Sequence, residues 1–228
     1  LATPPADPQW LAYEVVGAAV PDLLGVAEKR TKCRTRHAQP HLGAADPRLA
    51  ALARGVVRHH ADDAWFHEAP AFGRLSLAFA KRVRVELAEQ TSMRPWFLGH
   101  VAVELLLDDE LARRTPGMLD RYYERFASVD AAWVAGAVET MAGRGVGRLA
   151  EFIERFAEVR FLADYADDER LAYRLSQVMQ RVGLDALPTA FVSLLPTMRE
   201  DVAASVGELS RPLEQMRANW ETAAASAA

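Results

Sequence analysis

The sequence predicts an all-α fold. Alanine, leucine, arginine and glutamate dominate the chain, and all four are good helix formers. Apolar residues recur at helical spacing in most segments, prolines fall mostly between those segments, and strand-like alternation is weak. With 228 residues, half of them hydrophobic, the chain can bury a substantial core. We therefore expect one compact multi-helix domain over residues 1–228.

The expected elements follow from proline positions and apolar periodicity. Residues 1–9 predict an extended arm, and residues 222–228, rich in alanine and serine, predict a frayed tail. A short helix is expected over about 10–20, followed by a turn in which Asp22 either caps the next residues or points inward as a metal ligand. Further helices are expected from Pro47 to the break at Pro70, around 75–84, and over 94–113, 118–143, 149–165 and 168–182. One or two more are expected over 189–217.

Composition narrows the class of protein. The net charge of −4 gives no reason to expect nucleic-acid binding. The single cysteine, Cys33, excludes an internal disulfide framework and predicts a reducing, cytoplasmic location. We expect no membrane-spanning segment, because no stretch reaches about eighteen apolar residues. The sequence shows no leader pattern of a basic start and an apolar core, which says nothing of a leader removed before residue 1.

Residues 94–113 predict the central helix of the fold. Pro95 suits the first helical turn, where a missing N–H costs little, and the residues after it are apolar on nearly every face, as in a buried helix. His100, Glu104 and Asp108 nevertheless stand at i, i+4 and i+8, which places them on one side. A buried carboxylate such as Glu104 needs a cation, a proton or a metal.

Residues 56–70 repeat this spacing. His59, Asp63 and His67 stand at i, i+4 and i+8 among apolar and aromatic neighbours. Imidazole and carboxylate groups so spaced can share a metal, because their Cβ atoms lie about 6 Å apart. Two helices that each present such a stripe can enclose an ion between them.

The two stripes, together with Asp22, predict a divalent-metal centre. Mixed imidazole and carboxylate ligands suit Zn, Mn or Fe, and six groups could hold one or two ions. The expected ligands are Asp22, His59, Asp63, His67, His100 and Glu104, of which His59, Asp63 and Glu104 are expected to serve catalysis. Candidates for a second ion or for outer support are His60, Asp62, Asp108, His37 and His41.

Two alternatives stay open at this stage. The polar stripes could instead form a salt-bridged core in a non-catalytic helical binding or scaffold protein, although Arg58 is the only arginine within them. A run of basic residues near the N-terminus could be a solvated loop, or it could form a positive edge beside a site that binds a phosphate or a partner. That run consists of Lys29, Arg30, Lys32, Arg34 and Arg36.

Four pieces of the chain resemble the acyl carrier protein phosphodiesterase family, a helical relative of the HD-domain phosphohydrolases. They are residues 20–25 (VPDLLG), 59–70 (HHADDAWFHEAP), 99–113 (GHVAVELLLDDELAR) and 160–165 (RFLADY). His59, Asp63 and Pro70 match the family pattern. His67, Ala69 and Asp109 stand where the family has an aspartate, a histidine and another histidine.

This resemblance implies a metal-dependent phosphodiesterase in which metal-activated water attacks a phosphate ester. The implied substrate is the phosphodiester of 4′-phosphopantetheine on acyl carrier protein, or another phosphoester. Because such carriers are acidic, the resemblance also implies that the basic run is a docking surface.

The order of the six ligands is also similar to that of zinc-dependent phospholipase C and its nuclease relatives, which are all-α. Those enzymes begin with a ligating tryptophan, whereas this chain begins with Leu1 and has Trp10 as its first tryptophan. Both resemblances imply a phosphodiesterase, and they differ in metal count and in substrate.

Overall fold

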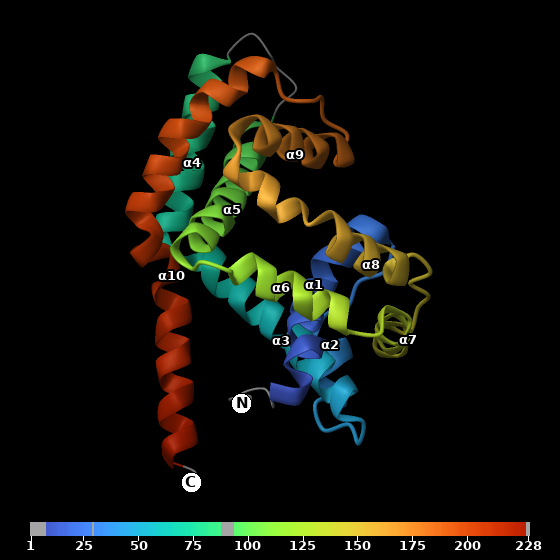
Figure 1. Ribbon diagram of the computed structural model, residues 1–228. Coiled ribbons are helices and arrows are strands. Elements are labelled where there is room, and N and C mark those ends of the chain that lie inside the picture. Colours follow the sequence, from blue (N-terminus) through green and yellow to red (C-terminus); the bar gives the residue numbers. More distant parts are fainter. Residues whose placement is uncertain (1–7, 29, 88–93, 227–228) are drawn as a thin grey trace. The chain divides into compact units, whose positions relative to one another are not determined.

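The computed structural model describes residues 8–28, 30–87 and 94–226, with side chains described up to residue 211 (Figure 1). Within these ranges every regular element is a helix, so the predicted all-α class is confirmed. The chain divides into two compact units. Unit 1 comprises Leu1–Ala64, Asp120–Arg160 and Gln215–Ala228, and unit 2 comprises Trp65–Leu119 and Phe161–Glu214. The single domain expected over 1–228 stays a prediction.

Unit 1 is built from the N-terminal helices and a later helical group. Its elements are η1 (Pro8–Trp10), α1 (Leu11–Ala27), α2 (Thr35–Ala38), η2 (Gln39–His41), α3 (Pro47–Glu68, of which the part to Ala64 belongs here), α6 (Met118–Ser128, of which the part from Asp120 belongs here), α7 (Ala131–Ala142), α8 (Leu149–Val159) and the end of α10 (Leu195–Ser226) from Gln215.

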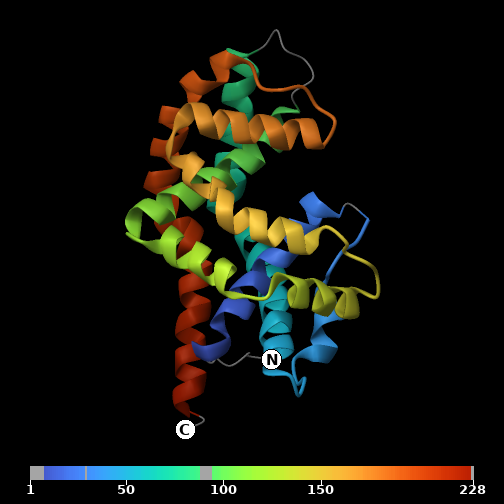
Figure 2. The same ribbon diagram turned by 45° about the vertical axis from the view of Figure 1, so that its right-hand side comes forward.

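Helices α1 and α3 pack with their backbones in close approach, and both views show them crossing (Figure 1, Figure 2). A Cβ placed on Gly17 would lie 2.2 Å from the carbonyl oxygen of Leu52, and one on Gly55 would lie 2.1 Å from that of Glu14. Glycine is therefore required at both positions, because a methyl group would have to displace helix backbone.

Helix α1 runs through Pro21, so the predicted end near residue 20 and the turn after it are wrong. Val16, Val20 and Leu24 are fully buried on both sides of the proline. Their packing against the rest of unit 1 outweighs the cost of the lost helical hydrogen bond. Asp22 consequently lies inside a helix, which excludes the predicted capping role.

The segment Pro8–Ala27 is long and apolar enough to cross a membrane, with a mean hydropathy of 1.3 in its most apolar window. The same criterion is met by core helices of soluble proteins and by leader sequences, so it is weak evidence for a span. The expectation that the chain has no membrane span stays a prediction.

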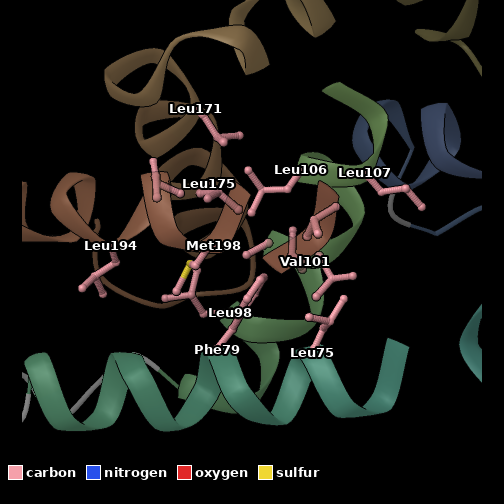
Figure 3. Packing of buried hydrophobic residues seen from close by; sticks show 14 of the residues in the cluster. Leu75, Phe79, Leu98, Val101, Leu106, Leu107, Leu171, Leu175, Leu194 and Met198 are labelled. Carbon is pink, nitrogen blue, oxygen red and sulfur yellow. The ribbon is translucent and has the colours of Figure 1, made fainter. Parts of the chain in front are cut away.

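Unit 2 contains the predicted central helix. Its elements are α4 (Pro70–Glu86), α5 (Pro95–Arg114), η3 (Phe161–Ala166), α9 (Asp168–Arg181), η4 (Thr189–Leu194) and α10 (Leu195–Ser226, of which the part to Glu214 belongs here). Figure 3 shows how side chains from these helices converge on one apolar core. The residues labelled there are Leu75, Phe79, Leu98, Val101, Leu106, Leu107, Leu171, Leu175, Leu194 and Met198.

Helix α5 lies within this core, as its apolar sequence predicts. Leu98 and Ala102 are fully buried and Leu106 is 1% exposed. A Cβ on Gly99 would lie 2.5 Å from the carbonyl oxygen of Ser76, so α4 and α5 are in close approach. His100 and Glu104 lie on a part of α5 that this packing leaves half-buried.

Several predicted boundaries are wrong for local reasons. The helix expected over 118–143 is two helices, because Asp130 accepts a hydrogen bond from the backbone N–H of Trp133 and caps a new start. The helix expected over 149–165 ends at Val159, where Arg160 adopts the left-handed conformation (φ 51°).

The two ends of the chain also differ from expectation. Helix α10 continues to Ser226, so the tail predicted to fray from residue 222 is helical that far, in keeping with the high helix propensity of alanine. Of the predicted extended arm, residues 8–9 belong to η1, while residues 1–7 lie outside the described residues.

Candidate metal centre

Three of the predicted ligands converge in unit 2. Helix α5 presents His100 and Glu104 one turn apart, and His67 comes from the last turn of α3. The Nε2 atoms of His67 and His100 lie 3.0 Å and 3.1 Å from the same oxygen, Oε1 of Glu104. The three side chains are 29%, 32% and 33% exposed, so the cluster is half-buried and open to solvent. We call it the His–His–Glu triad.

The triad could hold a metal ion. One ligand atom from each residue lies within 4.8 Å of the other two. Ligand atoms at 2.0–2.1 Å from a tetrahedral ion are about 3.3–3.4 Å apart. The two nitrogen–oxygen distances are therefore about 0.3 Å short of that value, a shift that small side-chain rotations can supply.

Aromatic rings fix the orientation of both imidazoles. The rings of His67 and His100 stack with centroids 4.7 Å apart. Phe72, which is 5% exposed, lies edge-on to both at 4.8 Å and also contacts Phe66 at 4.7 Å. Because Phe72 is embedded in the core of unit 2, it limits the rotation of the two rings and keeps both Nε2 atoms facing Glu104.

The other three predicted ligands are neighbours in unit 1. His59 Nε2 lies 4.0 Å from Asp22 Oδ1, and His59 and Asp63 are one turn apart on α3. The pKa of the Asp22 carboxyl is raised, first by desolvation and then by the nearby Asp63 carboxylate, and His59 and His60 oppose the rise. Because the Asp22 side chain is 80% exposed, water weakens the effect of desolvation on this pKa.

The six predicted ligands are thus divided into two groups of three. His67, His100 and Glu104 lie in unit 2, and Asp22, His59 and Asp63 lie in unit 1. Among the described residues, only the His–His–Glu triad brings three ligand atoms close enough for one ion.

The chain matches no protein-family model, no curated protein and no solved structure.

The predicted supporting residues have other contacts. His60 Nε2 donates to the carbonyl oxygen of Cys33 at 2.9 Å, and Asp62 pairs with Arg58. His37 Nδ1 lies 3.0 Å from the carbonyl oxygen of Lys32. His41 ends the short η2 helix, and Asp108 is exposed on α5. None of these five joins a three-ligand cluster within the described part of the chain.

Sequence reasoning missed a buried ion-pair network in unit 2. The guanidinium of Arg199 on α10 donates to Asp109 at 2.5 Å, to Asp168 at 2.7 Å and to the carbonyl oxygen of Tyr165 at 2.5 Å. Burial raises the pKa of the Asp109 carboxyl above its ordinary value, although Arg199 opposes the rise. The one available signal was an acidic pair, Asp109 and Glu110, within an apolar helix.

A pocket of about 370 Å³ borders this network, and Asp109, Glu110 and Arg199 are among its lining residues. Glu110 is buried, and its carboxylate pairs with Arg113 and Arg114. Burial by itself would raise the pKa of the Glu110 carboxyl. The hydrogen bonds from these two guanidinium groups outweigh burial and lower that pKa. The pocket lining carries four carboxylates, of Asp109, Glu110, Asp168 and Glu200, and two guanidinium groups, of Arg113 and Arg199.

Proposed function

We propose that the chain is a metal-dependent phosphodiesterase whose metal centre is the His–His–Glu triad. The observation that carries the proposal is the convergence of two imidazole nitrogens and one carboxylate oxygen from two helices. Three protein ligands of these types leave a fourth position open, as in catalytic zinc sites, whereas structural zinc sites use four.

His67, His100 and Glu104 would hold the ion through two neutral nitrogens and one carboxylate. A divalent ion bound there supplies Lewis acidity toward a phosphoryl oxygen and lowers the pKa of a bound water. The imidazoles must lose their Nε2 protons to act as ligands, so protons compete with the metal and binding weakens as the pH falls. Phe72 and the stacking of the two rings hold the nitrogens in place for this role.

The choice of a phosphodiester as substrate rests on sequence, not on the triad. Residues 59–70 and 99–113 resemble the acyl carrier protein phosphodiesterase family; the matching residues His59 and Asp63 lie outside the triad, and His67 stands where that family has an aspartate. Zinc-dependent phospholipase C is the competing resemblance. A substrate panel separates the two: a phosphopantetheine-bearing carrier protein against phosphatidylcholine, with bis-p-nitrophenyl phosphate as the general probe.

The test combines metal analysis with hydrolysis. Protein purified without a chelator is analysed for bound Zn, Mn and Fe and assayed on bis-p-nitrophenyl phosphate. We expect one ion per triad, and we expect His100→Ala and Glu104→Gln to abolish both the bound metal and the hydrolysis. His41→Ala, which changes a histidine outside the triad, is expected to leave both unchanged. Protein that binds no metal after reconstitution and stays inert contradicts the proposal.

A second candidate is a structural polar cluster in a non-catalytic binding or scaffold protein. The observation that favours it is that Oε1 of Glu104 already lies within hydrogen-bond distance of both imidazoles. This candidate predicts that His100→Ala lowers the melting temperature and that added zinc does not raise it. The metal centre predicts a higher melting temperature for the wild type when zinc is added, and no such rise for the variant.

A further inference from the structure

Unit 1 carries a row of exposed cations along an extended segment. Over residues 30–34 burial alternates: Thr31 and Cys33 are 4% and 2% exposed, whereas Arg30, Lys32 and Arg34 are all exposed. Alternation of this kind is typical of extended backbone, in which every second side chain points the same way. Lys32 and Arg34 therefore project from one side, about 6.4–6.8 Å apart, and Arg30 lies in the turn that precedes them.

Hydrogen bonds from elsewhere in unit 1 hold this segment in place. The hydroxyl of Thr31 donates to the carbonyl oxygen of Gly145 at 3.1 Å. On the other side, His60 Nε2 donates to the carbonyl oxygen of Cys33 at 2.9 Å. The row is consequently fixed before any partner arrives, which lowers the entropy lost on binding.

Further cations border the row. Arg36 follows in α2 and is exposed. Arg144 and Arg148, from the connection between α7 and α8, are also exposed, and Arg144 Nη1 donates to the carbonyl oxygen of Arg30 at 3.5 Å. We call the whole set the cationic row. It consists of Arg30, Lys32, Arg34, Arg36, Arg144 and Arg148; Lys29, the remaining member of the predicted basic run, lies outside the described residues.

Within the described residues, no carboxylate forms an ion pair with a member of the cationic row, whereas Arg54 and Arg58 of the same unit both pair with Glu14. The two nearest acidic residues by contact, Glu28 and Glu139, accept hydrogen bonds from backbone N–H groups of the α7–α8 connection. Six cations therefore form a positive surface on a chain whose net charge is −4.

We propose that the cationic row docks an extended acidic peptide, a segment with aspartate or glutamate at alternate positions. Such a peptide presents its carboxylates with the same two-residue spacing as Lys32 and Arg34, so these charges can pair one to one, and Arg30 extends the positive surface at the preceding turn. Residues 28–36 contain no aromatic side chain for stacking a nucleic-acid base and no large apolar side chain for insertion into a membrane. The proposal does not depend on the metal centre.

Fluorescence anisotropy with labelled probes tests the proposal on the full chain. The main probe is a peptide in which glutamate alternates with serine. A second peptide of equal composition has its glutamates in one block. Labelled oligothymidylate and phosphatidylserine vesicles represent the two other anionic partners.

At low salt we expect the alternating peptide to bind the wild type more tightly than the block peptide, and added salt to weaken binding. Arg30→Gln/Arg34→Gln is expected to weaken binding about tenfold or more, while Arg125→Gln/Arg155→Gln, which removes two cations of unit 1 outside the row, changes it by less than about twofold. Melting curves confirm that both variants are folded.

Four outcomes overturn the proposal. The alternating peptide does not bind at low salt, the block peptide binds equally well, both double variants lose binding equally, or oligothymidylate or the vesicles bind more tightly than the peptide.

Discussion

At the residue scale, the proposed metal centre depends on how two imidazoles are oriented. His67 and His100 direct their Nε2 atoms to one oxygen of Glu104, at 3.0 Å and 3.1 Å. The Phe72 ring touches both imidazoles, although no metal would touch it. Mutation of a residue that orients a metal ligand typically lowers the metal affinity about 10–100-fold.

Phe72→Leu is therefore expected to weaken zinc affinity about 10–100-fold, because the two imidazoles gain freedom to rotate. Phe79→Leu is the matched control, since Phe79 is fully buried on the same helix and belongs to the same core. Competition with a chromophoric zinc chelator measures the affinity, and thermal melting measures stability. If both variants lose equal stability and equal affinity, Phe72 has only a packing role.

At the scale of elements, the close approach of α1 and α3 leaves no space for a side chain at position 17. Gly17→Ala places a methyl carbon 2.2 Å from the carbonyl oxygen of Leu52, well inside van der Waals contact distance, and is expected to destabilise unit 1 by about 1–3 kcal/mol. Gly25→Ala, in the same helix, meets no atom within 4 Å and is expected to stabilise it by about 0.5–1 kcal/mol. Urea unfolding of both variants measures these changes. Equal effects would show that the helices are not packed this closely.

Arg199 links α10, α9, η3 and α5 through Asp168, Tyr165 and Asp109. Arg199→Met leaves the Asp109 carboxylate buried and without its closest cation, so we expect a loss of about 3–5 kcal/mol of unfolding free energy at neutral pH. Asp109→Asn/Arg199→Met should lose less, because the uncompensated charge is absent.

The pH dependence of the Arg199→Met variant has a definite sign. Burial already raises the pKa of Asp109, and removal of Arg199 raises it further. A raised carboxyl pKa means that ionisation opposes folding; the penalty is fully present above the folded-state pKa and disappears as the pH falls toward the ordinary value of 3.8. The difference in stability from the wild type should therefore be larger at neutral pH than near pH 4 in urea titrations. A difference that is constant with pH would contradict this account.

At the scale of the whole molecule, the sequence predicted those features that depend on neighbouring residues, namely helix starts and shared helix faces. Proline at position 47 and at position 95 marked the starts of α3 and α5, and the spacing of His100 and Glu104 predicted their shared helix face. The passage of α1 through Pro21 depends on packing with distant residues, which no local pattern records.

Pairings between distant residues could not be predicted either. Arg199 lies 90 residues from Asp109, and nothing in the sequence singles it out from the other arginines. The six predicted ligands are divided between two units because the boundary between the units falls within α3, after Ala64. The sequence shows two similar stripes and does not show this boundary. The basic run was visible in sequence, but the contributions of Arg144 and Arg148 to the cationic row were not.

X-ray absorption spectroscopy of the zinc-loaded protein tests the metal centre most directly. We expect first-shell nitrogen and oxygen scatterers at about 2.0–2.2 Å, with the outer-shell pattern of two imidazoles. Glu104→Gln should lower zinc occupancy. A spectrum dominated by a sulfur scatterer at about 2.3 Å, which would assign the zinc to Cys33, or zinc binding that is unchanged in Glu104→Gln, would contradict the account.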